Sequence, residues 1–135
     1  MSAAITDSDL YKRVQASAEE TLEDLMQGLK GVLAGVVATS DGFEVAARTS
    51  KNMDASKLAA TACSISALGA MVSEESEIGQ YHYLMVEASE GHVVILEVAH
   101  PAMPMILNLV ITRGDVLGQV LYQAKLAVKR LAAVG

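Results

Sequence analysis

Apolar residues recur at helical spacing near both ends of the chain. Within residues 9–29 and again within residues 115–133 they are three or four positions apart, and charged residues fill most of the opposite side. This pattern predicts one amphipathic helix at each end. The predicted buried stripes are Leu10, Val14, Ala18, Leu22, Leu25 and Leu29 in the first helix, and Val116, Val120, Ala124, Ala127 and Leu131 in the last.

Between these helices, five short apolar runs predict β-strands. They cover residues 32–38, 43–48, 81–88, 92–99 and 105–111. The sequence TSDG separates the first two runs, and an Asp-Gly pair in that position predicts a hairpin because Gly42 accepts a positive φ without strain. The segment HPAMP separates the last two runs, and its prolines cannot donate to a central ladder.

The predicted strands are apolar on both faces, as 92–99 illustrates. Val94, Leu96 and Val98 point one way, while Val93 and Ile95 point the other. A sheet whose two faces are both apolar needs helices on both faces to shield it from water. The sequence therefore predicts a single α+β domain over residues 1–135, in the order α-β-β-α-β-β-β-α, with a five-stranded, mainly antiparallel sheet between helices.

The middle helix, predicted over residues 55–78, carries no charge in the stretch LAATACSISALGAMVS, residues 58–73. On a helical wheel, Leu58, Ile65, Leu68 and Val72 form a side of large residues that suits packing on the sheet. The opposite side is apolar and mostly small: Ala59, Ala60, Cys63, Ala67, Ala70 and Met71. In one interpretation, this helix is buried in the core of its own monomer. The favoured interpretation sets the small side against a second copy, because three helices leave little material to cover another face.

Composition narrows the classes of function. Ten basic and sixteen acidic residues give a net charge of −6, which argues against nucleic acid as the main partner. A single cysteine excludes an internal disulfide and a cysteine-based zinc site. The stretch 58–73 is too short and too polar to cross a membrane, so no membrane insertion is expected. The N-terminal residues show no secretory signal, and a cytoplasmic location is the default expectation.

Candidate chemistry is sparse. No Gly-Lys-Ser or Gly-Lys-Thr follows the glycines, so no phosphate-binding loop is predicted. Three histidines lie in or beside strands without ligand spacing, although His82 and His92 could be cross-strand neighbours. Cys63 lies on an apolar side with no base, where a thiol behaves as a compact hydrophobe. We therefore expect no cofactor, no metal and no enzymatic activity.

Several segments together resemble the roadblock family of dynein light-chain type, over essentially the whole chain. They are the hairpin GVVATSDGFEVAAR, the helix KLAATACSISALGAMVSEESEIG and the closing helix GDVLGQVLYQAKLAVKRL. The resemblance implies a fold related to longin and profilin domains. It also implies a dimer in which the two middle helices pack antiparallel and edge strands, here 81–87, join the sheets. The expected interface residues are Ala59, Cys63, Ala67, Ala70, Met71, Tyr81, Tyr83 and Met85.

The resemblance further implies a partner. Bacterial and archaeal roadblock proteins commonly act on Ras-like small GTPases as activators or platforms, which predicts a homodimeric GTPase regulator or scaffold. The alternative is a structural adaptor with no effect on nucleotide turnover. A ligand-binding enzyme or sensor is disfavoured because polar residues do not converge. Residues that could contact the GTPase are Arg48, Glu74, Glu75 and Arg113, with the arginines as possible fingers or as plain surface residues.

Overall fold

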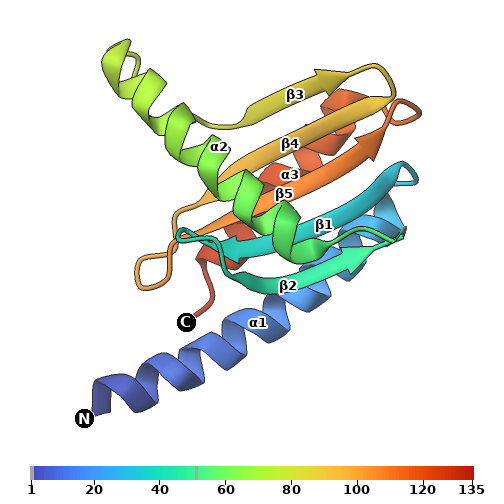
Figure 1. Cartoon of the computed structure of the whole chain (residues 1–135). Helices are drawn as coiled ribbons and strands as arrows, with labels where there is room; N and C mark the ends of the chain where they lie inside the picture. The colour runs from blue at the N-terminus through green and yellow to red at the C-terminus, as the bar shows by residue number, and fades with distance from the viewer. Residues whose placement is uncertain (1, 51) are drawn as a thin grey trace.

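One antiparallel sheet forms the centre of the computed structural model, which describes residues 2–50 and 52–135 (Figure 1). The strands lie in the order β2-β1-β5-β4-β3, so β2 and β3 are the two edges. This arrangement confirms the predicted element order and the antiparallel pairing. The strands are β1 (Val32–Thr39), β2 (Glu44–Thr49), β3 (Leu84–Ala88), β4 (Gly91–Val98) and β5 (Met105–Thr112).

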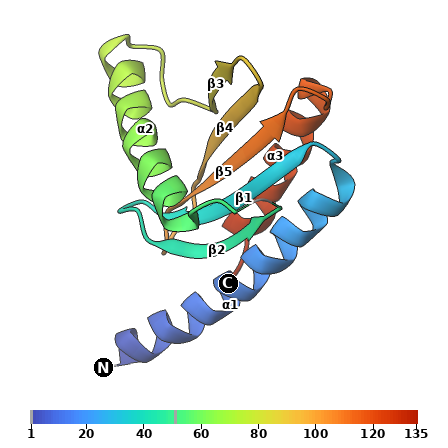
Figure 2. The ribbon, with the colours of Figure 1, turned by 45° about the vertical axis from the view of Figure 1, so that its right-hand side comes forward.

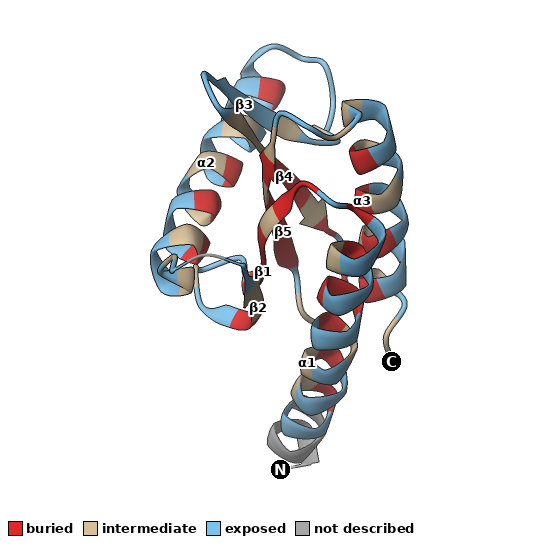
Figure 3. Ribbon diagram, turned by 90° about the vertical axis from the view of Figure 1, so that its right-hand side faces the viewer, coloured by how far each residue is buried: buried red, intermediate tan, exposed pale blue. Residues whose placement is uncertain are grey.

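Helices cover both faces of the sheet, as predicted. α1 (Ser2–Gly28) and α3 (Leu117–Ala132) lie on one face, and α2 (Ala55–Glu75) crosses the other (Figures 1 and 2). The main core lies between the sheet and the α1–α3 layer, where buried residues line the inward sides of both helices (Figure 3). The predicted stripe of α1 is buried throughout. In α3 the prediction is wrong for Val116, which is 75% exposed because it is the extended N-cap residue that precedes the helix.

α2 packs on the sheet mainly through small residues, and here the predicted orientation is wrong for two of the four large residues. The residues of α2 buried against the sheet are Ala59, Ala62, Ser66 and Ser73. Leu68 and Val72, predicted to face the sheet, are both 60% exposed. The helix lies close to the sheet in its C-terminal half: a Cβ added at Gly69 would lie 2.5 Å from Cδ1 of Leu84. Leu58 and Ile65, of the same predicted side, are half-buried and pack against core residues, so the prediction fails for Leu68 and Val72 and holds in part for Leu58 and Ile65.

Three elements have an end that differs by three residues or more from the predicted bounds. α1 begins at Ser2 rather than at residue 9, because no helix breaker separates its Ala-rich start from the amphipathic part. α2 ends at Glu75 and β3 begins at Leu84, because Glu77 and Gly79 adopt positive φ values of 55° and 87° and redirect the chain. The hairpin is confirmed: Gly42 has φ 96°, and the amide of Thr39 donates to the carbonyl of Phe43 at 2.8 Å.

α2 is longer than its uncharged stretch. Among the helices of the described residues it alone is long and apolar enough to cross a membrane, judged by length and composition only. Helices that pack on a sheet can meet the same test, and α2 lies along β1, β5, β2 and β4. The expected absence of membrane insertion therefore stays a prediction.

Candidate protein-interaction surface

β3 is the least covered strand of the sheet. All five of its residues are exposed or half-buried, whereas β1 and β5 are almost wholly buried. Met85 is 41% exposed on one face of the strand, and Val86 is 45% exposed on the other. A two-residue turn joins Ala88 to Gly91, and the pair that flanks such a turn is hydrogen-bonded to each other. The backbone groups of the alternate residues Met85 and Glu87 therefore point to the free edge.

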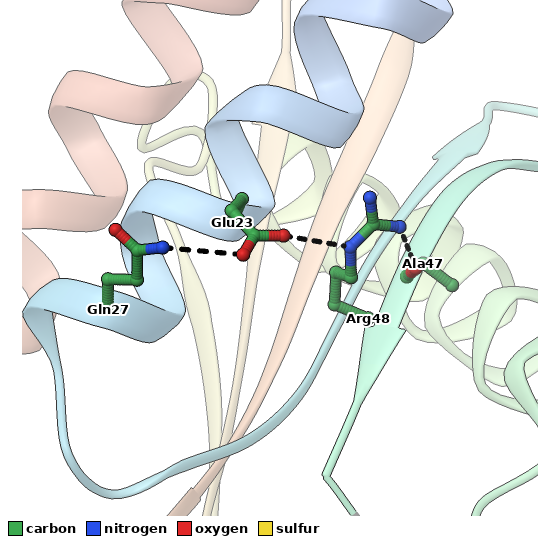
Figure 4. A network of polar contacts seen from close by, with 4 residues as sticks. All are labelled: Glu23, Gln27, Ala47 and Arg48. Carbon is green, nitrogen blue, oxygen red and sulfur yellow. Dashed lines mark hydrogen bonds and ion pairs between the residues drawn. The ribbon is translucent and has the colours of Figure 1, made fainter.

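The other edge strand, β2, is closed by side chains. The amide of Ser50 donates to the carbonyl of Leu33, which sets the ladder so that Val45 and Ala47 turn their carbonyls away from β1. Gln15 of α1 donates to the first carbonyl at 3.1 Å. Arg48 donates to the second at 2.9 Å and to Glu23 of α1 at 3.3 Å (Figure 4). Among the described residues, no side chain makes a corresponding bond to a backbone group of β3.

The outer side of α2 continues the uncovered region. Leu68, Met71 and Val72 are between 54% and 60% exposed, and no charged residue lies between Lys57 and Glu74. A hollow of about 260 Å³ joins this helix to β3. We call it the α2–β3 pocket. It is lined by Lys57, Leu58, Thr61, Ala62 and Ile65 of α2 and by Val86, Val93, Ile95 and Asn108 of the sheet.

Two hydrogen bonds hold α2 against the sheet and the segment before β3. The hydroxyls of Ser66 in α2 and Tyr81, just before β3, form a short hydrogen bond. Burial raises the pKa of the Tyr81 phenol above its ordinary value of 10.0. Asn108 of β5 donates to the carbonyl of Leu58 at 3.4 Å, and its Oδ1 accepts no bond from any described residue.

On the opposite face of the sheet, the ammonium of Lys125 in α3 lies 5.6 Å from the centre of the Tyr83 ring, just before β3.

The start of α2 is fixed by Asp54. This N-cap carboxylate accepts hydrogen bonds from the hydroxyl and amide of Ser56 and from the amide of Lys57. The bond from the Ser56 hydroxyl contributes most to the lowered pKa of Asp54. The N-terminal half of α2, which lines the α2–β3 pocket, is therefore well anchored.

The residues expected at the dimer interface differ in how exposed they are. The prediction is wrong for Ala59, which is 0% exposed against its own sheet and has no surface to offer a second copy. Cys63 is half-buried, with its thiol donating to the carbonyl of Ser40. The remaining side chains are exposed or half-buried, and their role in a dimer stays a prediction: Ala67, Ala70, Met71, Tyr81, Tyr83 and Met85.

The sequence pattern predicts that Leu68 and Val72 face the sheet, and it does not single out Val86. Their exposure together on one face of the molecule is a product of the fold. One signal was present in the sequence: Leu58, Ile65, Leu68 and Val72 lie on one side of the helix. Side-by-side packing on a second helix needs such a line of large residues as much as packing on a sheet does.

The four residues expected to contact a GTPase do not form one site. Arg48 and Arg113 lie near the ends of the parallel-running strands β2 and β5, whereas Glu74 and Glu75 end α2 at the other end of the sheet (Figure 1). Both arginines bond backbone carbonyls: Arg48 that of Ala47, and Arg113 that of Ser89 at 2.6 Å. Glu74 and Glu75 are exposed and form no ion pair with any described residue.

The histidines are dispersed. His82 precedes β3, while His92 pairs across the strands with Glu87 at 3.6 Å, so the expected His82–His92 neighbourhood is wrong. His100 is buried: its Nδ1 accepts from the amides of Ala102 and Met103, and its Nε2 donates to the carbonyl of Val134. Within the described part of the chain, no group of three or more His, Cys, Asp or Glu residues is placed to hold a metal ion.

Fold and surface together define a three-layer α/β domain whose uncovered surface is one edge strand and the outer side of one helix. Residues 18–108 match the Roadblock/LC7 domain family, and the chain belongs to that family. A search of the curated proteins found no match.

Solved structures agree with this fold. The gliding protein MglB of Thermus thermophilus is 18% identical, with a TM-score of 0.79 over 90% of each chain. Another MglB structure, described with a tetrameric arrangement, is 19% identical, with a TM-score of 0.79 over 93% of this chain and 89% of that one. A chain of the LokiProfilin1–rabbit actin complex is 16% identical, with a TM-score of 0.56 over 85% and 93% of the two chains. At these identities the likeness establishes the fold, including its relation to profilins.

Proposed function

We propose that this protein is a homodimeric regulator or platform for a Ras-like small GTPase and has no catalytic site of its own. Membership of the Roadblock/LC7 family carries this proposal, because proteins of this type serve as regulators or adaptors rather than as enzymes. The likeness to MglB, including the tetrameric arrangement of one such structure, supports an assembly of several copies. The cytoplasm, where small GTPases meet their regulators, is the proposed location.

The uncovered α2–β3 surface supports the homodimer. A strand exposed on both faces with a free edge is a template for pairing with another strand. Exposed apolar side chains on α2 adjoin it through the α2–β3 pocket, so one partner can cover both. A second copy offers the same strand and the same helix, which is the requirement for a twofold contact.

The structure favours action through the partner's own loops rather than through a donated arginine. An arginine finger must reach the transferred phosphoryl group. Arg48 and Arg113 instead bond carbonyls of their own chain, and Arg48 is also paired with Glu23. We therefore expect this protein to order the switch loops of its GTPase.

The decisive experiment is a GTP-hydrolysis assay with a Ras-like GTPase whose gene lies near the gene for this protein. Binding of the two proteins is measured in parallel. A regulator changes the rate of hydrolysis; unchanged hydrolysis with retained binding would assign the adaptor role instead. The Arg48→Ala/Arg113→Ala variant should keep both binding and any stimulation. Normal binding with complete loss of stimulation would show that an arginine is donated after all.

A further inference from the structure

A second hollow, of about 360 Å³, lies on the face of the sheet opposite the α2–β3 pocket. It is lined by residues 80–82, by the end of β4 and by the C-terminal half of α3, and we call it the α3–β4 pocket. These segments are far apart in the chain, so only the fold brings them together. The volume lies within the range of pockets that hold small molecules.

Two lysines of α3 line this pocket. Lys125 and Lys129 are about one helical turn apart, and neither forms an ion pair with any described residue. Like charges at this spacing repel each other, and an anion beside both of them would relieve that repulsion. The next residue, Arg130, is by contrast paired with Asp24 of α1 at 2.8 Å. The two lysines therefore offer an unneutralised positive charge to the pocket.

β4 contributes backbone groups that β3 leaves uncovered. The ladder between these strands alternates from the turn before Gly91, so its last pair, Leu84 with Ile95, is hydrogen-bonded. Glu97, two residues further along β4, consequently turns its amide and carbonyl toward the same side. Neither group forms a hydrogen bond with the backbone of the described residues 80–83. A free amide beside two ammonium groups is a further donor for an anion.

The carboxylate of Glu97 does not cancel this charge. Side chains alternate along a strand, and Ile95 packs on the α2 side of the sheet, so Glu97 leaves β4 on that side as well. Its carboxylate accepts a hydrogen bond from Gln80. On the α3 side, Leu96 is buried and Val128 is half-buried. The pocket thus places two cations beside an apolar wall.

We propose that the α3–β4 pocket binds a small amphiphilic anion, a carboxylate joined to a short hydrocarbon chain. The carboxylate lies between the ammonium groups of Lys125 and Lys129 and accepts from the amide of Glu97. The hydrocarbon chain packs on Leu96 and Val128. No residue of α2 is among those that line this pocket, so the site does not depend on the proposed homodimer or on the GTPase.

The first experiment titrates the full chain with hexanoate and follows the backbone amide signals by NMR. We expect the shifts to concentrate in residues 80–82, 96–99 and 125–129. Hexylammonium has the same chain and the opposite charge and should leave these signals in place. Inorganic phosphate has no hydrocarbon part and should bind more weakly. No shift with millimolar hexanoate, or phosphate binding as tightly as hexanoate, would overturn the proposal.

A matched set of lysine substitutions locates the site. Lys125→Gln and Lys129→Gln should each raise the dissociation constant for hexanoate about tenfold, because each removes one charge-assisted contact. Lys57→Gln is the control: Lys57 also lacks an ion pair among the described residues, but it lines the apolar α2–β3 pocket. Circular dichroism checks that each variant folds. Loss of affinity in Lys57→Gln, with native affinity in the two α3 variants, would place hexanoate in the other pocket and overturn the assignment.

Discussion

The two edges of the sheet are treated in opposite ways. At β2, Gln15 and Arg48 occupy the outward carbonyls of Val45 and Ala47, and the pairing of Arg48 with Glu23 of α1 fixes its guanidinium in place (Figure 4). At β3, the described side chains leave the backbone groups open, and both faces of the strand are exposed. An uncovered edge strand can pair with a strand of another chain, and proteins commonly cover the edge strands that they do not use for pairing. The comparison identifies β3 as the edge available for a partner.

The largest effect should follow from closing the open edge. Met85→Pro removes an amide that points away from β4, so the monomer should fold while strand pairing with a second copy is lost. Light scattering should show a monomer with a native circular dichroism spectrum. Thr49→Pro is the matched control, because Thr49 ends β2 with its amide also turned outward. Loss of the dimer in Thr49→Pro alone would reverse the roles of the two edges.

An intermediate effect should follow from opening the closed edge. The Gln15→Ala/Arg48→Ala variant exposes the carbonyls of Val45 and Ala47 and should lower the free energy of unfolding by about 1 kcal/mol, since the lost bonds are partly exposed. Species larger than the native assembly should appear in size-exclusion chromatography as concentration rises. An unchanged elution profile at every concentration would show that β2 needs no such cover.

The smallest effect concerns the approach to the open edge. Tyr81→Phe removes the single bond to Ser66 and should lower the free energy of unfolding by about 0.5 kcal/mol. Because the folded-state pKa of Tyr81 is raised, its contribution to stability is present below the ordinary value of 10.0 and is lost as the pH rises from that value through the raised one. Urea unfolding of both proteins between pH 8 and about 11 should therefore converge. A difference that does not depend on pH would show that the phenol does not titrate with unfolding.

Much of the fold is predictable from local patterns. The stripe of α1 and the hairpin at Gly42 depend on spacing and turn chemistry within a few residues, and both are confirmed. The sequence pattern predicts the end of α2 too late, because the side chain of Glu77 gives no strong signal for its positive φ. The buried line of α2 (Ala59, Ala62, Ser66 and Ser73) runs between the two sides that residue size distinguishes, so neither side as predicted is the one that meets the sheet.

The candidate surface was less predictable for a related reason. Which side of α2 meets the sheet depends on how closely helix and strands approach, and that distance is set by contacts such as Gly69 with Leu84, fifteen residues apart. Likewise, the cover of β2 comes from Gln15, thirty residues away from Val45. Sequence patterns report on neighbours along a helix or strand, whereas these properties depend on tertiary distances.

Gly69 limits which substitutions α2 tolerates. It is the residue of α2 that faces Leu84 of β3, and a Cβ added there would lie 2.5 Å from Cδ1 of Leu84. Gly69→Ala therefore obliges the Leu84 side chain to shift at the start of the open edge strand. The surface that α2 and β3 share thus depends on a position that carries no side chain of its own.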